Sequence, residues 1–263
     1  MQLIKSQAFG NDFLLVEAEA VRGMDDVPAL ARRVCDRHRG IGADGLLLFS
    51  ASPDRRRASM RLFNADGSAS EISGNGLRCL AAWLARSGGG SVLEVETDAG
   101  PKRLDLLGRA GERFTFRAAM GHPDRVRLER LHVHGTEVDA VTLRVGNPQC
   151  VVLGDVTPER LQTLAAALAV HPHFPEGTNV ELATVEGPHT VRILIWERGV
   201  GPTEASGTGA CAAAVAAMQF GGAAREVEVI APGGAQRVEW LAEGLFLTGW
   251  AEIVAEAQWL ADA

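Results

Sequence analysis

Two short segments of the sequence share a pattern: a serine, then Gly-x-Gly, then an alanine-rich apolar run. They are Ser73-Gly74-Asn75-Gly76 and Ser206-Gly207-Thr208-Gly209. Glycines let the backbone approach a ligand closely, and the free amides of a helix N-terminus attract an anion such as a carboxylate. Two such helix starts, related by a pseudo-twofold axis, could hold one carboxylate from both sides. Ser73 and Ser206 would then flank the adjacent carbon, so that one removes a proton and the other delivers one, as inversion requires.

Both serines also have a structural explanation. Serine is a preferred N-cap residue, because its oxygen accepts a hydrogen bond from an amide two or three residues further on. A helix N-cap is also a place where the pKa of a nucleophile or base is tuned. The sequence therefore leaves capping and proton transfer open for Ser73 and Ser206, and the two roles are compatible.

Other residue patterns give weaker indications of chemistry. Four histidines form two i, i+2 pairs without a third ligand group, so we expect no metal site; they are His132/His134 and His171/His173. The chain has only two lysines, and neither stands out as a Schiff-base residue. The glycine motifs match neither a dinucleotide-binding nor a P-loop fingerprint. The sequence therefore favours a mechanism without metal or cofactor.

A comparison of the sequence with itself reveals an internal repeat. Four segments recur in the same order at offsets of 133 to 136 residues: 10–12 with 146–148, 42–44 with 177–179, 61–64 with 194–197, and 71–76 with 204–209. The repeat predicts two pseudo-symmetric domains, residues 1–115 and 116–248. Residues 249–263 have no counterpart at the end of the first half, so they could cross back and complete the first domain.

The local patterns predict many short strands and few helices. Strand-like runs bounded by Gly, Pro, Asp or Asn are residues 14–17, 46–49, 60–63, 92–96, 113–117, 141–145, 151–153, 191–196, 227–230 and 246–248. Helix-like stretches are residues 27–37, 76–85, 158–169 and 209–220. Thr157 followed by Pro158 is typical of a helix start. This distribution favours an α+β fold over a doubly wound sheet.

Composition limits the classes of function. The 263 residues are 46% hydrophobic and carry a net charge of −7 with acidic and basic residues interspersed, which argues against a nucleic-acid surface. The N-terminal residues lack a signal-peptide pattern, and the most apolar stretch is too short to span a membrane. Four cysteines without a CxxC pair indicate reduced thiols. We therefore expect a cytoplasmic protein that binds a small molecule; its oligomeric state is open, with a homodimer as one option.

In order and spacing, a set of motifs resembles the diaminopimelate epimerase family over nearly the whole chain. The matching segments are 9–13, 40–45, 63–68, 74–76, 146–148, 178–179, 197–199 and 207–211. The resemblance implies two pseudo-symmetric α+β domains, each a sheet wrapped around a central helix, with the active site in the cleft. It also implies an isomerase independent of pyridoxal phosphate that interconverts LL- and meso-diaminopimelate, a precursor of lysine and peptidoglycan.

The resemblance also implies which residues contact the substrate. These are the side chains of Asn11, Asn64, Asn147, Asn179, Glu197 and Arg198, and the backbone amides of Gly74, Asn75, Gly207 and Thr208. An arginine can clamp a distal carboxylate through two hydrogen bonds. The helix amides can stabilise the negative charge that develops as the α-carbon loses its proton.

Two positions depart from the family pattern. The family's catalytic cysteines fall at Ser73 and Ser206, and its histidine after Gly-Asn-Pro falls at Gln149. A thiol has an ordinary pKa of about 8.5, whereas a hydroxyl is far less acidic and needs a neighbouring base to act. The sequence offers no histidine partner, and leaves Glu71, Glu204 or water as helpers. We therefore expect little α-proton exchange from the Ser/Ser protein.

Several explanations of the serines follow. The chain could be a natural, divergent family member, an amino-acid-binding relative without catalysis, or an engineered Cys-to-Ser variant. Engineering would leave Gln149 unexplained, so the sequence favours natural divergence. Another isomerase of the same fold, resembling proline racemases or phenazine-biosynthesis enzymes, is a further alternative. The combination of Asn64, Asn179, Glu197 and Arg198 favours a diaminopimelate-like ligand over proline.

Overall fold

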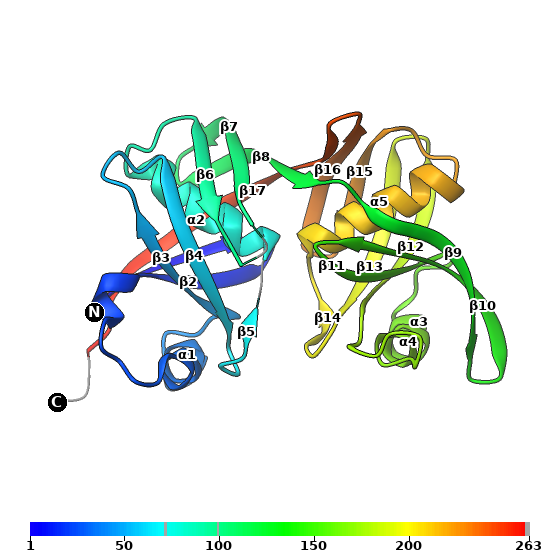
Figure 1. Cartoon of the computed structure of the whole chain (residues 1–263), viewed down its shortest axis with the longest axis horizontal. Helices are drawn as coiled ribbons and strands as arrows, with labels where there is room; N and C mark the ends of the chain where they lie inside the picture. The colour runs from blue at the N-terminus through cyan, green and yellow to red at the C-terminus, as the bar shows by residue number, and fades with distance from the viewer. Residues whose placement is uncertain (71–72, 99, 261–263) are drawn as a thin grey trace. The chain divides into compact units, whose positions relative to one another are not determined.

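The computed structural model describes residues 1–70, 73–98 and 100–260, and its chain divides into two compact units (Figure 1). Unit 1 comprises residues 1–118 together with the C-terminal segment that begins at Gly249. Unit 2 comprises Ala119–Thr248. Within the described residues, no helix is long and apolar enough to cross a membrane.

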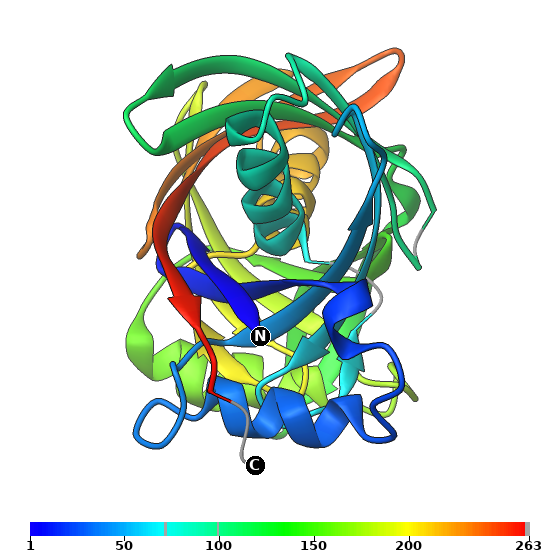
Figure 2. The same cartoon turned by 90° about the vertical axis from the view of Figure 1, so that its left-hand side faces the viewer.

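Unit 1 is a closed ring of strands around one helix. Its elements are β1 (Gln2–Ala8), β2 (Asn11–Glu17), the 3₁₀ turn η1 (Ala18–Val21), α1 (Val27–Cys35), β3 (Gly45–Ala51), β4 (Arg57–Asn64), β5 (Ala69–Ser70), α2 (Gly74–Arg86), β6 (Val92–Glu96), β7 (Lys102–Ala110), most of β8 (Arg113–Gly121) and most of β17 (Gly244–Gln258). Strand pairing runs β1-β2-β3-β4-β6-β7-β8, and β17 closes the ring by pairing with β1 and β8. Figure 2 shows α2 enclosed by these strands and α1 outside them.

Hydrophobic patterning explains which helix lies inside the ring. Almost every residue of α2 from Gly74 to Leu84 is buried, whereas α1 buries one face formed by Leu30, Ala31 and Val34. A helix that is apolar on one stripe packs on the outside of a sheet, as α1 does. The enclosed α2 buries Asn75 and Arg78 together with its apolar residues. The helix predicted for residues 27–37 begins at Val27, with the Asp26 side chain accepting from the Ala29 amide, and ends at Cys35.

Unit 2 repeats this arrangement. Its elements are β9 (Asp124–Val133), β10 (Thr136–Val145), β11 (Asn147–Leu153), α3 (Pro158–Arg160), the π-helical turn η2 (Leu161–Ala165), α4 (Ala166–Ala169), β12 (Asn179–Gly187), β13 (Thr190–Glu197), β14 (Gly201–Thr203), α5 (Gly207–Phe220), β15 (Glu226–Ala231), β16 (Gly234–Leu241) and the start of β17. Pairing runs β9-β10-β11-β12-β13-β15-β16-β17. The residues Gly207 to Ala217 of α5 are all buried.

The strand register relates the two units residue by residue. The parallel pair β2–β3 places Leu15 opposite Leu47, and the parallel pair β11–β12 places Val151 opposite Glu181. Leu47 also pairs with Leu62 on β4, and Glu181 with Ile195 on β13. This register makes Leu47 and Glu181 equivalent positions. It also makes Gly45 the equivalent of Asn179, one residue later than the match of residues 42–44 with 177–179 in the sequence.

Candidate active site

Ser73 caps the central helix of unit 1. Its backbone is extended, with φ −127° and ψ 123°, and its Oγ accepts a hydrogen bond of 3.1 Å from the Gly76 amide. The Ser73 carbonyl accepts from the Leu77 amide at 2.8 Å. The amides of Gly74 and Asn75 precede this helical hydrogen-bond ladder, so their dipoles are directed toward the helix start. Capping is therefore a real role of Ser73, and it leaves the hydroxyl proton available.

Asn75 links the start of α2 to the β1–β2 turn. Its Nδ2 donates to Asn11 Oδ1 at 3.2 Å, and its Oδ1 accepts from Arg78. Asn11 in turn donates to Asp44 Oδ2 at 2.7 Å. Asn75 and Arg78 are 2% and 0% exposed. The structure thus brings two of the predicted contact residues, Asn11 and Asn75, together beside Ser73.

An ionic cluster holds this turn in place. Arg37 bonds Asp12 and Asp44 at 2.8 Å each, and Lys5 Nζ lies 3.0 Å from Asp12 Oδ2. Burial acts to raise the pKa of Asp12, but hydrogen bonds and charges from Arg37 and Lys5 outweigh it, so the pKa is lowered. Asp12 is therefore an ionised structural anchor for Asn11. The fourth residue predicted in unit 1, Asn64, ends β4 and donates to Ser68 Oγ at 2.9 Å.

Ser206 caps α5 in the same geometry. Its φ and ψ are −136° and 127°, its Oγ accepts from the Gly209 amide at 3.2 Å, and its carbonyl accepts from the Ala210 amide at 2.9 Å. Ser206 is 4% exposed, and Gly207 and Thr208 are buried with it. Each unit therefore presents a serine-capped helix start with first-turn amides, as the repeat predicts.

Asn179 and Arg198 form a second group of predicted residues in unit 2. Asn179 Oδ1 accepts from the Arg198 amide at 2.9 Å, and Arg198 Nη1 donates to the Glu176 carbonyl at 2.9 Å. The Arg198 side chain crosses Gly177, whose φ is +72°; a Cβ there would lie 3.0 Å from Arg198 Cδ. Glycine is required at position 177 by both its φ and this contact. The exposed guanidinium remains able to meet an anion.

Asn147 and Gln149 meet at the start of β11. Gln149 Nε2 donates to Asn147 Oδ1 at 2.7 Å, and Gln149 is fully buried. Within the described residues its Oε1 has no hydrogen-bond partner. The Gln149 side chain thus orients Asn147, and its Oε1 is a buried acceptor that could receive a further hydrogen bond. Its equivalent in unit 1 by strand register is Phe13, because Phe13 pairs with Gly45 as Gln149 pairs with Asn179.

Glu181 is a candidate that the sequence did not reveal. It lies on β12 and is 0% exposed, and neither carboxyl oxygen has a hydrogen-bond partner in the described part of the chain. A Cβ built at Gly209 would lie 2.6 Å from Glu181 Oε1 and 3.1 Å from Ser206 Cβ. The carboxyl therefore lies beside the serine cap of α5. Burial first, and the negative charge of Glu197 second, raise the pKa of Glu181 well above its ordinary value.

The same position in unit 1 is apolar. A Cβ built at Gly76 would meet Ser73 Cβ at 3.4 Å, Leu47 Cδ1 at 3.5 Å and Phe13 Cε1 at 3.5 Å. Leu47 thus occupies beside Ser73 the place that Glu181 occupies beside Ser206. Of the helpers considered from the sequence, Glu71 lies outside the described residues, and Glu204 is exposed.

The four cysteines are not substitutes for the missing thiol bases. Cys35, Cys79, Cys150 and Cys211 are all buried. Burial raises the pKa of Cys35 and of Cys79 to about 12. A thiolate is the reactive form of cysteine, so a thiol held protonated in this way is inert.

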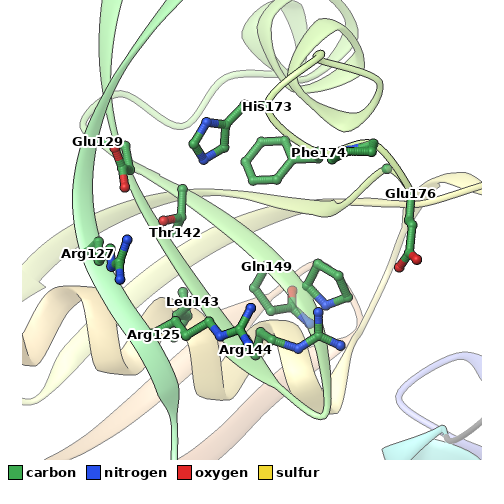
Figure 3. A pocket seen from close by; sticks show the side chains of 13 residues that line it. Arg125, Arg127, Glu129, Thr142, Leu143, Arg144, Gln149, His173, Phe174 and Glu176 are labelled. Atoms are coloured by element: carbon green, nitrogen blue, oxygen red, sulfur yellow. The ribbon is translucent and has the colours of Figure 1, made fainter.

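A cavity of about 660 Å³ opens in unit 2 beside the groups formed by Asn147 with Gln149 and by Asn179 with Arg198 (Figure 3). Side chains from β9, β10 and the loop before β12 line it, among them Arg125, Arg127, Glu129, Arg144, His173 and Phe174. Gln149, Glu176 and Gly177 also line it, but neither Ser206 nor Glu181 does. We therefore place the candidate chemistry at the helix starts.

The fold matches solved structures of epimerases and racemases. A predicted epimerase from Pseudomonas aeruginosa matches with a TM-score of 0.74 and 18% identity, over 99% of both chains. A probable proline racemase from Agrobacterium radiobacter matches with a TM-score of 0.75 and 17% identity, over 99% of this chain and 93% of that one. At these identities the likeness establishes the α+β fold.

Sequence comparison then identifies the family. The family model for diaminopimelate epimerase matches residues 3–126 and 141–254. The diaminopimelate epimerase of Desulforudis audaxviator is 43% identical over 99% of both chains. The chain belongs to the diaminopimelate epimerase family.

Proposed function

We propose that this protein is a cofactor-independent isomerase that moves a proton at the α-carbon of diaminopimelate, converting the LL form to the meso form. The observation that supports this most strongly is the repeated helix start. Both units place a serine hydroxyl at the N-cap of an enclosed helix, at 3.1 and 3.2 Å from the amide that it caps. One half-site removes the α-proton and the other returns one.

The first-turn amides supply the electrostatic part of the reaction. As the α-carbon loses its proton, charge passes into the adjacent carboxylate, and amides aimed at that carboxylate stabilise it without reorganisation. Gly74 and Asn75 begin α2, and Gly207 and Thr208 begin α5. Asn11, bonded to Asn75 and Asp44, provides an oriented polar group beside the start of α2. Asn147, the matching residue of the repeat, is oriented by Gln149.

Arg198 provides recognition of the distal end of the substrate. Its amide and guanidinium are held by Asn179 and by the Glu176 carbonyl, but the side chain stays exposed. A guanidinium has five N–H donors, so one bond to a carbonyl leaves donors for a bidentate carboxylate contact. This supports a dicarboxylic amino acid as the substrate.

Thermal unfolding tests the substrate assignment. Diaminopimelate should raise Tm, because a ligand that binds only the folded state stabilises it in proportion to its concentration over Kd. Arg198→Ala should abolish the shift, while Arg192→Ala, at an exposed arginine paired with Glu186, should retain it. Stabilisation by proline or glutamate, with none by diaminopimelate, would contradict the assignment.

A binding protein without catalysis is the second candidate, and the surroundings of Ser73 favour it. Leu47 and Phe13 offer no proton acceptor to that hydroxyl. Such a protein would bind diaminopimelate with the same dependence on Arg198. It would show no α-proton exchange even after cysteines replace both serines.

A further inference from the structure

Glu181 is a buried acid, and the burial of its unpaired carboxyl should lower the free energy of unfolding. Its presence therefore calls for an explanation. Its carboxyl is fully buried, and within the described ranges neither oxygen has a hydrogen-bond partner. Buried polar groups in native proteins are nearly always satisfied, and exceptions concentrate at catalytic or strained sites. The equivalent Leu47 shows that the scaffold accepts an apolar side chain at this place. The carboxyl is therefore not needed to build the strand.

The side chains of Glu181 and Ser206 converge on one point at the start of α5. Glu181 Oε1 and Ser206 Cβ lie 2.6 and 3.1 Å from the place that a Cβ on Gly209 would occupy. Glycine at position 209 is what leaves room for the carboxyl there. Ser206 Oγ already accepts from the Gly209 amide, so its own proton is available for donation.

The surroundings of Glu181 favour proton uptake. Glu197 on β13 acts on it from a neighbouring strand, because its negative charge raises the pKa of Glu181. The strand register places Gln149 of β11 on the same face of the sheet, whereas the buried Cys150 packs with Val180 and Leu182 on the other face. The helix contributes Ser206 and Gly209. Burial and a like charge both favour the protonated carboxyl, so they raise the pKa of Glu181 and make the group able to take up a proton.

We propose that Glu181 is the proton acceptor behind Ser206, so that the serine works as one half of a relay. This inference rests on the proposed function. As Ser206 Oγ takes the α-proton, the Cα–H bond breaks and a new Oγ–H bond forms. The Ser206 hydroxyl and the Glu181 carboxyl lie beside the same glycine without a hydrogen bond to each other, so the relay requires them to come into contact in the substrate complex. The original hydroxyl proton then passes to the Glu181 carboxylate, and the negative charge moves to the substrate. The reverse transfer returns a proton to the same face of the α-carbon.

Ser73 has no equivalent relay among the described residues, because Leu47 and Phe13 take the corresponding places. Proton transfer at one face of the α-carbon should then be much faster than at the other. The unaltered protein should therefore exchange the α-proton faster than it inverts the centre. One stereoisomer of diaminopimelate should gain deuterium with its configuration retained.

Deuterium incorporation at the α-carbon in heavy water tests this relay, with LL- and meso-diaminopimelate followed separately. Glu181→Gln should slow exchange by about 10²-fold or more, the usual contribution of a general base. Glu181→Asp keeps a carboxylate and should retain more exchange than Glu181→Gln. The matched control is Glu186→Gln, an amide at an exposed glutamate of the same strand, which should leave exchange unchanged.

The pH profile separates proton transfer from a structural role. Since the relay needs an ionised Glu181 and burial raises its pKa, exchange should rise with pH above the ordinary range of glutamate. Glu181→Gln should lose this rising limb. If that variant fails to fold, the profile of the unaltered protein decides, and an exchange rate that does not rise with pH above the ordinary range of glutamate would overturn the proposal.

The outcomes distinguish this inference from the proposed function. Equal exchange by the unaltered protein and a folded Glu181→Gln variant overturns the relay. The relay is also overturned if the unaltered protein shows no exchange while the Ser73→Cys/Ser206→Cys variant does exchange. In that case the proposed function stands. Failure of both the unaltered protein and the double variant to exchange, although each binds diaminopimelate, overturns both.

Discussion

The starts of α2 and α5 share their caps and differ in what lies beside them. Ser73 and Ser206 make the same hydrogen bond to the third residue of their helices. Next to that bond, unit 1 has Leu47 and unit 2 has Glu181 at the equivalent strand position. The comparison shows that the repeat fixes the backbone that positions a group, whereas the inward side chains decide what that group can do.

The largest effect should come from placing the unit 2 acid into unit 1. Leu47→Glu buries a carboxyl against Phe13 with no evolved partner, and an uncompensated buried charge typically costs about 3–5 kcal/mol of unfolding free energy. Denaturant unfolding measures the loss. A loss below about 1 kcal/mol would mean that unit 1 already accommodates an acid beside Ser73, and the contrast between the units would be weaker than described.

The two helix glycines should respond differently to alanine. At Gly76 a Cβ would meet its neighbours at 3.4–3.5 Å, so Gly76→Ala should be neutral or stabilising by up to about 1 kcal/mol. At Gly209 a Cβ would lie 2.6 Å from Glu181 Oε1, so Gly209→Ala should cost about 1–3 kcal/mol. Combining Gly209→Ala with Glu181→Ala should recover part of the loss. Equal effects at the two glycines would place the Glu181 carboxyl elsewhere.

Removing the acid from unit 2 should stabilise the fold. Glu181→Leu copies unit 1 and should raise the unfolding free energy by about 1–2 kcal/mol at pH 7, because an unpaired buried polar group is lost. The pKa of Glu181 is raised in the folded state, so its folded form binds the proton more tightly than the unfolded chain. Stability of the unaltered protein should therefore fall as pH rises above the ordinary glutamate range, and Glu181→Leu should flatten that slope. A steeper slope in the variant would show that another group titrates.

A smaller effect is expected from the ionic anchor of unit 1. Arg37 is half exposed, so Arg37→Ala should cost only about 1 kcal/mol despite its two carboxylate contacts. The pKa of Asp12 is lowered, so its contribution is present above the ordinary pKa of aspartate and is lost as pH falls through the lowered value. Arg37→Ala should reduce the loss of stability on acidification. In unit 2, by contrast, Asn179 makes a neutral hydrogen bond, in which its Oδ1 accepts from the Arg198 amide. Asn179→Ala should therefore leave the loss of stability on acidification unchanged.

The sequence predicted the scaffold better than it predicted the chemistry. The serine caps, Thr157 before Pro158 and the four repeated segments have local signatures, and the helices begin within two residues of their expected starts. β12 was not among the predicted strands, although Asn179, Val180, Glu181 and Leu182 alternate polar and apolar residues. Such alternation is typical of a strand with one solvent face, whereas the structure buries Val180, Glu181 and Leu182 in succession. A glutamate in such a run looks like a solvent-exposed residue. Its role emerges only from the register that places it beside Gly209.

Exchange of the α-proton of diaminopimelate by the Ser73→Cys/Ser206→Cys variant tests the central claim most directly. If the two helix starts are acid/base half-sites, thiols with a lower pKa than hydroxyls should raise exchange and epimerisation by about 10²–10⁴-fold over the unaltered protein. Each single change should do less, because inversion needs a competent group in both half-sites. A folded double variant that binds diaminopimelate and yet exchanges no faster than the unaltered protein would contradict this account.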